Sequence, residues 1–140
     1  MSSAVVDASV AVKWFVPERH ASDAVRLLRA DLTLLSPDLI WIEVGNVLWK
    51  KWRAGELTAV AVQGILDDFR RFPLEIWPAE GLLASAWEIA QASGRTMYDS
   101  LYLALAVAAQ TQMVTADRRL WNAIQGTPLV RHCLWVGNLA

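Results

Sequence analysis

Short apolar runs alternate with longer segments of helical periodicity along the 140-residue chain. The short runs have the length of buried β-strands, whereas the segments between them place apolar residues every three or four positions, as amphipathic helices do. The predicted strands span residues 4–7, 32–35, 74–77, 113–115 and 133–136. The predicted helices span residues 9–15, 20–30, 39–54, 58–71, 82–92, 97–109 and 118–125.

Capping residues mark the ends of several of these helices. Ser9 and Thr58 carry hydroxyls that can accept a hydrogen bond from the first turn of a helix. Glycine, which often ends helices, follows three of them at Gly55, Gly94 and Gly126. Because parallel strands require crossover connections, strands separated by helices predict an α/β fold with a mostly parallel five-stranded sheet and helices on both faces. No repeat or linker interrupts the pattern, so a single domain is expected over the whole chain.

The composition is that of a globular protein with one core. Hydrophobic residues make up 55% of the chain, charged residues make up 19%, and the mean hydropathy is +0.29, which together exclude intrinsic disorder. The longest uncharged stretch, residues 100–116, contains Gln110 and Gln112, and no basic segment precedes the apolar run near the N-terminus. We therefore expect a cytoplasmic protein with no membrane association.

Charge and cysteine content narrow the possible ligands. The net charge of -1 is not that of a domain with a broad basic face for nucleic acid. That total would mislead if several acids shared one metal-filled pocket, because the rest of the surface would then be positive. Cys133 is the only cysteine, and with His20 and His132 it cannot complete a tetrahedral zinc site. Metals held by oxygen ligands remain possible.

Two acids lie at or just beyond the carboxyl ends of predicted strands. Asp7 ends the first strand, and Asp117 comes after the strand at 113–115. Ligand sites in parallel sheets lie beyond the carboxyl ends of the strands, so both side chains are candidates for such a site. Each of them is also placed to cap the helix that follows, and the sequence leaves both roles open.

Two further acids interrupt apolar helix faces. Asp99 is the only charge in the segment 96–116, where an unpaired carboxylate would be costly to bury. Its alternative role is a capping box with Thr96. Glu43 shares a helix face with apolar neighbours, and its alternative partner, Lys50, is two turns away and out of reach for an i,i+4 pair. Both positions favour side chains directed inward.

A cluster of these four acids would need a compensating charge. Two carboxylates about 4 Å apart repel by about 4 kcal/mol at an effective dielectric constant of about 20, so protons or a hard divalent cation must be present. Oxygen ligands suit Mg²⁺ or Mn²⁺. The sequence has neither a glycine-rich phosphate loop nor the elbow of serine hydrolases, which leaves metal-assisted hydrolysis of a phosphodiester.

Four segments of the chain together resemble the PIN-domain ribonucleases, specifically the VapC-type toxins. The segments are Val5-Val6-Asp7-Ala8-Ser9, Glu43-Val44-x-Asn46-Val47-Leu48, Tyr98-Asp99-Ser100-Leu101-Tyr102-x-Ala104-Leu105-Ala106 and Val114-Thr115-Ala116-Asp117-Arg118. The resemblance implies a PIN-like three-layer fold and an endoribonuclease that depends on Mg²⁺ or Mn²⁺ and acts as a toxin. It also implies a cognate antitoxin partner. The family's catalytic and metal-binding acids fall on Asp7, Glu43, Asp99 and Asp117.

The resemblance also implies supporting polar positions, whereas candidate substrate contacts are chosen because basic side chains bind phosphates. Ser9, Asn46 and Thr115 match the family's supporting polar positions, with helix capping or a polar helix face as their alternative role. Candidate contacts to RNA phosphates are Lys13, Lys50, Lys51, Arg53, Arg95, Arg118 and Arg119. The chain has 8 tryptophans, most of them expected in the core and the others at a homodimer or antitoxin interface.

Two other functions remain possible from the sequence. A non-catalytic PIN-like module that binds RNA or protein would keep the fold without cleaving RNA. A phosphohydrolase that uses Asp7 as a covalent nucleophile is disfavoured, because that pattern requires a second aspartate where this chain has Ser9.

Overall fold

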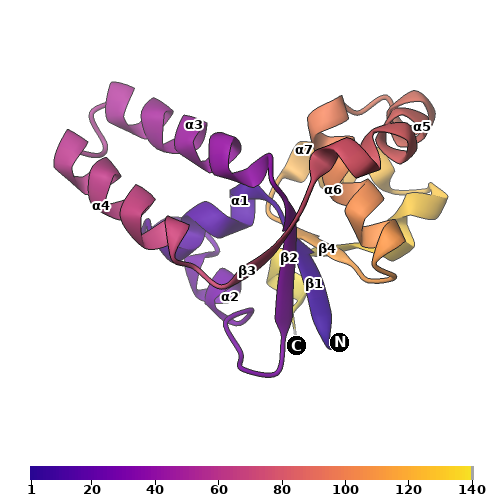
Figure 1. The fold of residues 1–140 in the computed structure, drawn as a ribbon, viewed down its shortest axis with the longest axis horizontal. Coiled ribbons are helices and arrows are strands. Elements are labelled where there is room, and N and C mark those ends of the chain that lie inside the picture. The colour runs from indigo at the N-terminus through magenta and orange to yellow at the C-terminus, as the bar shows by residue number, and fades with distance from the viewer. Residues whose placement is uncertain (140) are drawn as a thin grey trace.

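The computed structural model describes residues 1–139 and contains one five-stranded sheet (Figure 1). Every strand pair is parallel, and the strand order is β3-β2-β1-β4-β5. The predicted α/β class is therefore confirmed. The strands are β1 (Ser3–Val6), β2 (Thr33–Pro37), β3 (Leu74–Trp77), β4 (Met113–Thr115) and β5 (Cys133–Trp135).

Helices cover both faces of this sheet. In Figure 1, α3 and α4 project as a hairpin on one side of the sheet, while α5 and α6 lie on the other. The α-helices are α1 (Ala8–Ala11), α2 (Ala21–Val25), α3 (Ile40–Arg53), α4 (Ala59–Arg70), α5 (Leu83–Ser93), α6 (Met97–Ala108) and α7 (Arg118–Ile124). Short 3₁₀ turns span Val12–Trp14, Ala79–Leu82, Pro128–His132 and Val136–Asn138.

The core lies where the central strands meet α6. Ala4, Val5 and Val6 of β1 are fully buried, as expected for a strand covered on both faces. Residues 100–106 of α6 are buried as well, and this helix contacts both β1 and β2. Burial on nearly all sides explains why this helix is almost wholly apolar, and it makes the single acid near its start, Asp99, conspicuous.

The first two helices are shorter than the pattern predicts. The segment predicted at 9–15 begins with α1 and continues as a 3₁₀ turn, and its cap is Asp7 rather than Ser9. The segment predicted at 20–30 contains only α2, because the backbone after Val25 tightens into hydrogen bonds that span three residues instead of four. Apolar spacing does not distinguish these two kinds of turn.

The other predicted elements agree with the structure to within about two residues at each end. Thr58 caps α4 as expected, and Thr96 caps α6. Among the described residues, no helix is long and apolar enough to cross a membrane.

Candidate active site

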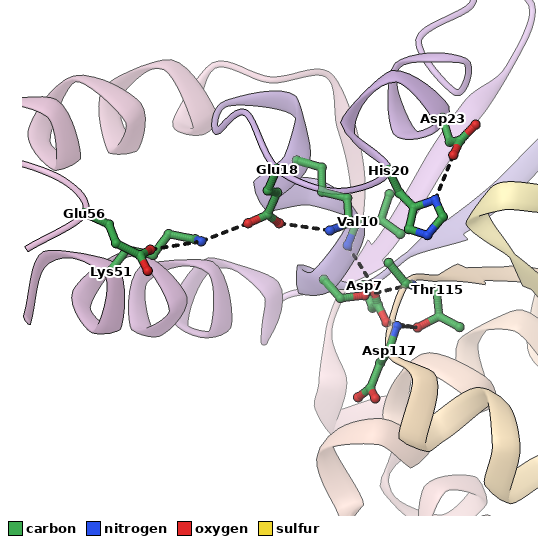
Figure 2. Close-up of polar contacts among 12 residues, drawn as sticks. Asp7, Val10, Glu18, His20, Asp23, Lys51, Glu56, Thr115 and Asp117 are labelled. Atoms are coloured by element: carbon green, nitrogen blue, oxygen red, sulfur yellow. Dashed lines mark hydrogen bonds and ion pairs between the residues drawn. The ribbon is translucent and has the colours of Figure 1, made fainter. Parts of the chain in front are cut away.

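Asp7 is the centre of the candidate site, at the carboxyl end of β1 (Figure 2). One carboxylate oxygen, Oδ1, accepts hydrogen bonds from the hydroxyl of Ser9 at 2.6 Å and from the backbone N–H of Val10 at 3.1 Å. The other, Oδ2, accepts a hydrogen bond from the hydroxyl of Thr115 at 2.6 Å. Asp7 therefore both caps α1, the alternative role named above, and presents an oriented carboxylate at the edge of the sheet.

The environment of Asp7 favours the protonated acid. Burial raises the pKa of Asp7 from 3.8 to about 6, against the opposing effect of the hydrogen bonds from Ser9, Thr115 and Val10, and the nearby charge of Asp117 raises the pKa further. A carboxylate that is ionised here at neutral pH is costly without a positive partner. A bound cation would offset this cost, so the site is suited to bind one.

Ser9 and Thr115 join the two loops that carry Asp7 and Asp117. The hydroxyl oxygen of Ser9 accepts from the backbone N–H of Ala116, and that of Thr115 accepts from the N–H of Asp117, both at 3.0 Å. Asp117 caps α7, since its Oδ1 accepts from the first turn of the helix. These bonds fix the loop after β1 against the loop after β4, so the orientation of both acids depends on the same two hydroxyls.

Asp99 is oriented by an arginine of its own segment. Its Oδ2 accepts two hydrogen bonds from Arg95, from Nε at 3.1 Å and from Nη2 at 2.8 Å. Only half of the anticipated capping box is present. The N–H of Asp99 donates to the hydroxyl of Thr96, but the carboxylate binds Arg95 instead of returning to the Thr96 backbone.

Glu43 is held by a tyrosine that the sequence reasoning did not identify. The hydroxyl of Tyr102 donates to Glu43 Oε1 at 2.5 Å, and within residues 1–139 Lys50 is not a partner of Glu43. Burial raises the pKa of Glu43, and Asp99 raises it further. Tyr102 lies three positions after Asp99, on the same face of α6. This spacing was the feature of the sequence from which its place beside the acids could have been predicted.

The four acids act on one another electrostatically. Asp117 raises the pKa of Asp7, and Asp99 raises that of Glu43. The pKa of Tyr102 is raised by burial and by three of the acids, which links the two pairs. The structure therefore places Asp7 near Asp117 and Glu43 near Asp99, and Tyr102 lies close enough to both pairs to be influenced by each.

Each of these carboxylates keeps an oxygen lone pair that no hydrogen bond from residues 1–139 occupies. At Asp7 the open lone pair belongs to Oδ2, which accepts a single hydrogen bond. In each of the other three acids, one carboxylate oxygen accepts no hydrogen bond from these residues. As they stand, no three His, Cys, Asp or Glu side chains in the described part of the chain are grouped closely enough to hold a metal ion by themselves. The donor set fits a Mg²⁺ or Mn²⁺ ion that retains several waters.

The basic candidates differ in whether they are already engaged. Lys13 and Lys51 both bind Glu18, at 2.9 and 2.8 Å. Figure 2 shows the contact between Lys51 and Glu18. Glu18 is not a solvated surface acid, because the two ammonium groups lie on either side of its partly buried carboxylate and lower its pKa against the opposing effect of burial. Arg95 is bound to Asp99, as described.

The remaining basic candidates lie on exposed parts of the surface. The guanidinium carbon of Arg53 lies over the ring of Trp49 of the α3–α4 hairpin at 5.4 Å from its centroid, and that of Arg118 lies over Trp135 at 3.9 Å. Arg119 is exposed on α7. Lys50 lies with Glu43, Asn46 and Tyr98 in the lining of a surface groove of about 450 Å³.

Most of the tryptophans pack in or against the core, and three are exposed. Trp135 is 8% exposed, whereas Trp49, Trp52 and Trp87 are each about half exposed. Trp49 and Trp52 line a second, apolar groove of about 300 Å³ between α3 and α4. The other four, Trp14, Trp41, Trp77 and Trp121, are partly buried against the core.

Comparison of the chain with known proteins identifies its family. Residues 4–125 match the PIN domain. Ribonuclease VapC3 of Pyrobaculum aerophilum is 34% identical over 118 residues, which cover 83% of this chain and 90% of the relative. Ribonuclease VapC3 of Mycobacterium tuberculosis is 33% identical over 119 residues, 85% of each protein.

A solved structure agrees at the level of the fold. The crystal structure of VapBC2 from Rickettsia felis, bound to a DNA fragment from their promoter, superposes with a TM-score of 0.63 at 15% identity and covers 95% of this chain and 98% of that one. The domain match and the two ribonuclease relatives confirm the resemblance noted in the sequence. The chain belongs to the PIN domain family, and VapC ribonucleases are among its relatives.

Proposed function

We propose that this protein is an endoribonuclease that depends on Mg²⁺ or Mn²⁺ and acts as the toxin of a toxin–antitoxin pair. The observation that carries the proposal is the buried, hydroxyl-oriented carboxylate of Asp7, with Asp117 beside it and the Glu43–Asp99 pair linked to it through Tyr102. The ribonuclease relatives, which span most of the chain, support the choice of RNA as substrate.

The residues that would hold the cation are Asp7, Glu43, Asp99 and Asp117. Each would use the oxygen lone pair that its orienting hydrogen bonds leave open. When bound, such a cation positions a phosphate and lowers the pKa of a coordinated water. The contribution of the chain is to hold four carboxylates in place before any ligand arrives, so that little reorganisation is needed during the reaction.

The groove beside Glu43 is a path for the RNA. Its lining combines the ammonium group of Lys50, the amide of Asn46 and the ring of Tyr98, which is 59% exposed. An exposed aromatic ring can stack on a nucleotide base without selecting its identity, and a lysine can bind a phosphate. Since Tyr98 directly precedes Asp99, a base stacked on this ring would lie next to the acids.

The expected protein partners are also part of this proposal. The apolar groove between α3 and α4, with its exposed tryptophans, is suited to an antitoxin protein, and the solved VapBC2 structure shares the fold of this chain. We also propose that the toxin is a homodimer. Co-expression with the adjacent reading frame followed by size-exclusion chromatography tests both predictions, and a lone monomer with no bound partner would contradict them.

The decisive experiment is RNA cleavage by the purified chain with Mg²⁺, with Mn²⁺ and with EDTA. We expect cleavage with either metal and none with EDTA, and we expect Asp7→Asn and Asp99→Asn to remove it. Asp67→Asn is the matched control, because it makes the same chemical change at an exposed position on α4. Equal cleavage by all variants, or cleavage in EDTA, would refute the metal site. RNA binding with no cleavage under any condition would favour the alternative, a non-catalytic binding module.

A further inference from the structure

We infer that Arg118 binds an RNA phosphate next to the cleaved bond, an inference that rests on the proposed function. The guanidinium carbon of Arg118 lies 3.9 Å from the centroid of the Trp135 ring, and the side chain is otherwise exposed. Within residues 1–139, the N–H groups of this guanidinium have no hydrogen-bond acceptor or carboxylate partner. A guanidinium held by stacking therefore keeps its planar set of donors available for a phosphate.

The ring beneath Arg118 is a rigid support. Trp135 is 8% exposed, and the imidazole of His20 meets it edge-on with the ring centroids 5.5 Å apart. The ring of Trp121 packs against it at 6.2 Å, and His20 is itself held by Asp23 at 2.8 Å. Since these neighbours fix the indole, stacking on it restricts the guanidinium more than an exposed arginine is usually restricted.

The sheet places this arginine at the edge of the acidic site. Trp135 is the register partner of Thr115 in the β4–β5 pair, and Thr115 donates its hydroxyl hydrogen bond to Asp7. Asp7, Thr115 and Trp135 thus form a row across three neighbouring strands, and two strand spacings amount to about 10 Å. Arg118 also directly follows Asp117 in the chain. An RNA strand with one phosphate at Asp7 would therefore pass the guanidinium of Arg118 on the β5 side of the site.

The other basic candidates differ from Arg118, since Lys50 and Arg119 are exposed without an aromatic ring beneath them among the described residues, and three others are already paired. Arg95 has two of its donors on Asp99, and Lys13 and Lys51 are bound to Glu18. A cluster of carboxylates repels the phosphates of RNA, so an uncompensated positive group beside it matters for binding. Within the described residues, Arg118 is charged, is held against the Trp135 ring, and has no acidic partner.

The test measures RNA binding in an Asp7→Asn background, which removes turnover. Fluorescence anisotropy with a labelled single-stranded RNA oligonucleotide of mixed sequence gives Kd between about 50 and 200 mM salt. We expect Arg118→Ala to weaken binding about three- to tenfold and to make the salt dependence shallower by about 0.7 in the slope of log K against log salt. Arg118→Lys should restore the slope but not the full affinity, because lysine keeps the charge and loses the planar donors.

The matched control is Arg131→Ala. Arg131 is an exposed arginine that precedes β5, so it lies at the opposite end of the strand that carries Trp135. If Arg118→Ala and Arg131→Ala change affinity and slope equally, the inference is overturned, since only net charge would matter. If the parent cleaves RNA but Arg118→Ala binds it like the background protein, the inference fails and the proposed function stands. A parent that neither binds nor cleaves RNA would overturn both.

Discussion

Replacing Asp7 by asparagine should stabilise the metal-free protein at neutral pH. The amide keeps the shape of the side chain and can still accept the hydrogen bond from Val10 and one from a hydroxyl, but it carries no charge. What it removes is the cost of holding an ionised carboxylate in a buried position. The sign is opposite to that expected for most substitutions of buried polar residues.

The size of the effect follows from the pKa of Asp7. This pKa is 3.8 in the absence of structure and about 6 in the folded protein. The difference of about two pKa units corresponds to about 3 kcal/mol. The folded state holds the proton of Asp7 more tightly than the unfolded state, so protonation of Asp7 stabilises the fold. This contribution to the free energy of unfolding is complete below pH 3.8, falls as pH rises, and is lost above about pH 6. The Asp7→Asn variant would show no such loss.

Urea unfolding in EDTA measures this directly. The free energy of unfolding is determined for the parent and for Asp7→Asn at about pH 4 and about pH 7.5, and we expect the difference between the two proteins to change by about 2–3 kcal/mol in favour of the variant. Titration of groups that do not interact with Asp7 cancels in that difference. The exposed control Asp67→Asn should show no such change. A difference for Asp7→Asn that stays within about 1 kcal/mol across this range would refute the argument from burial.

Three other outcomes are expected. Mn²⁺ at about 100 times its Kd should stabilise the parent by roughly 2.7 kcal/mol in thermal melts, with a smaller response for Asp99→Asn, and an indifferent parent would contradict the cation site. Tyr102→Phe removes the hydrogen bond that lowers the pKa of Glu43, so the acid limb of the cleavage pH profile should move to higher pH, and an unchanged limb would contradict this. Glu18→Gln should lower stability by about 1 kcal/mol at low salt and less at high salt, because Lys51 loses a partly buried partner, and equal stability to the parent would show that the pair contributes nothing.

The features predicted correctly from the sequence are those that depend on neighbouring residues. The strand at 74–77 and the cap of α4 by Thr58 follow from an apolar run and from a hydroxyl at a helix start, which are local properties. Asp7 and Asp117 could be placed at one edge of the sheet because parallel strands all end there. The lengths of α1 and α2 were wrong, because apolar spacing does not register where a helix tightens into 3₁₀ turns.

The partner of each charged group was decided by the tertiary structure. Glu18 lies between Lys13 and Lys51, and Glu43 meets Tyr102 from a different helix; these contacts join residues that are up to 59 positions apart. Likewise, the sequence alone placed four acids near strand ends and helix starts, but the raised pKa of Asp7 comes from the atoms that surround it after folding. Hydrogen bonds within a helix or turn follow the order of the chain, so the sequence determines them, whereas burial and ion pairing depend on distances that exist only once the core has packed.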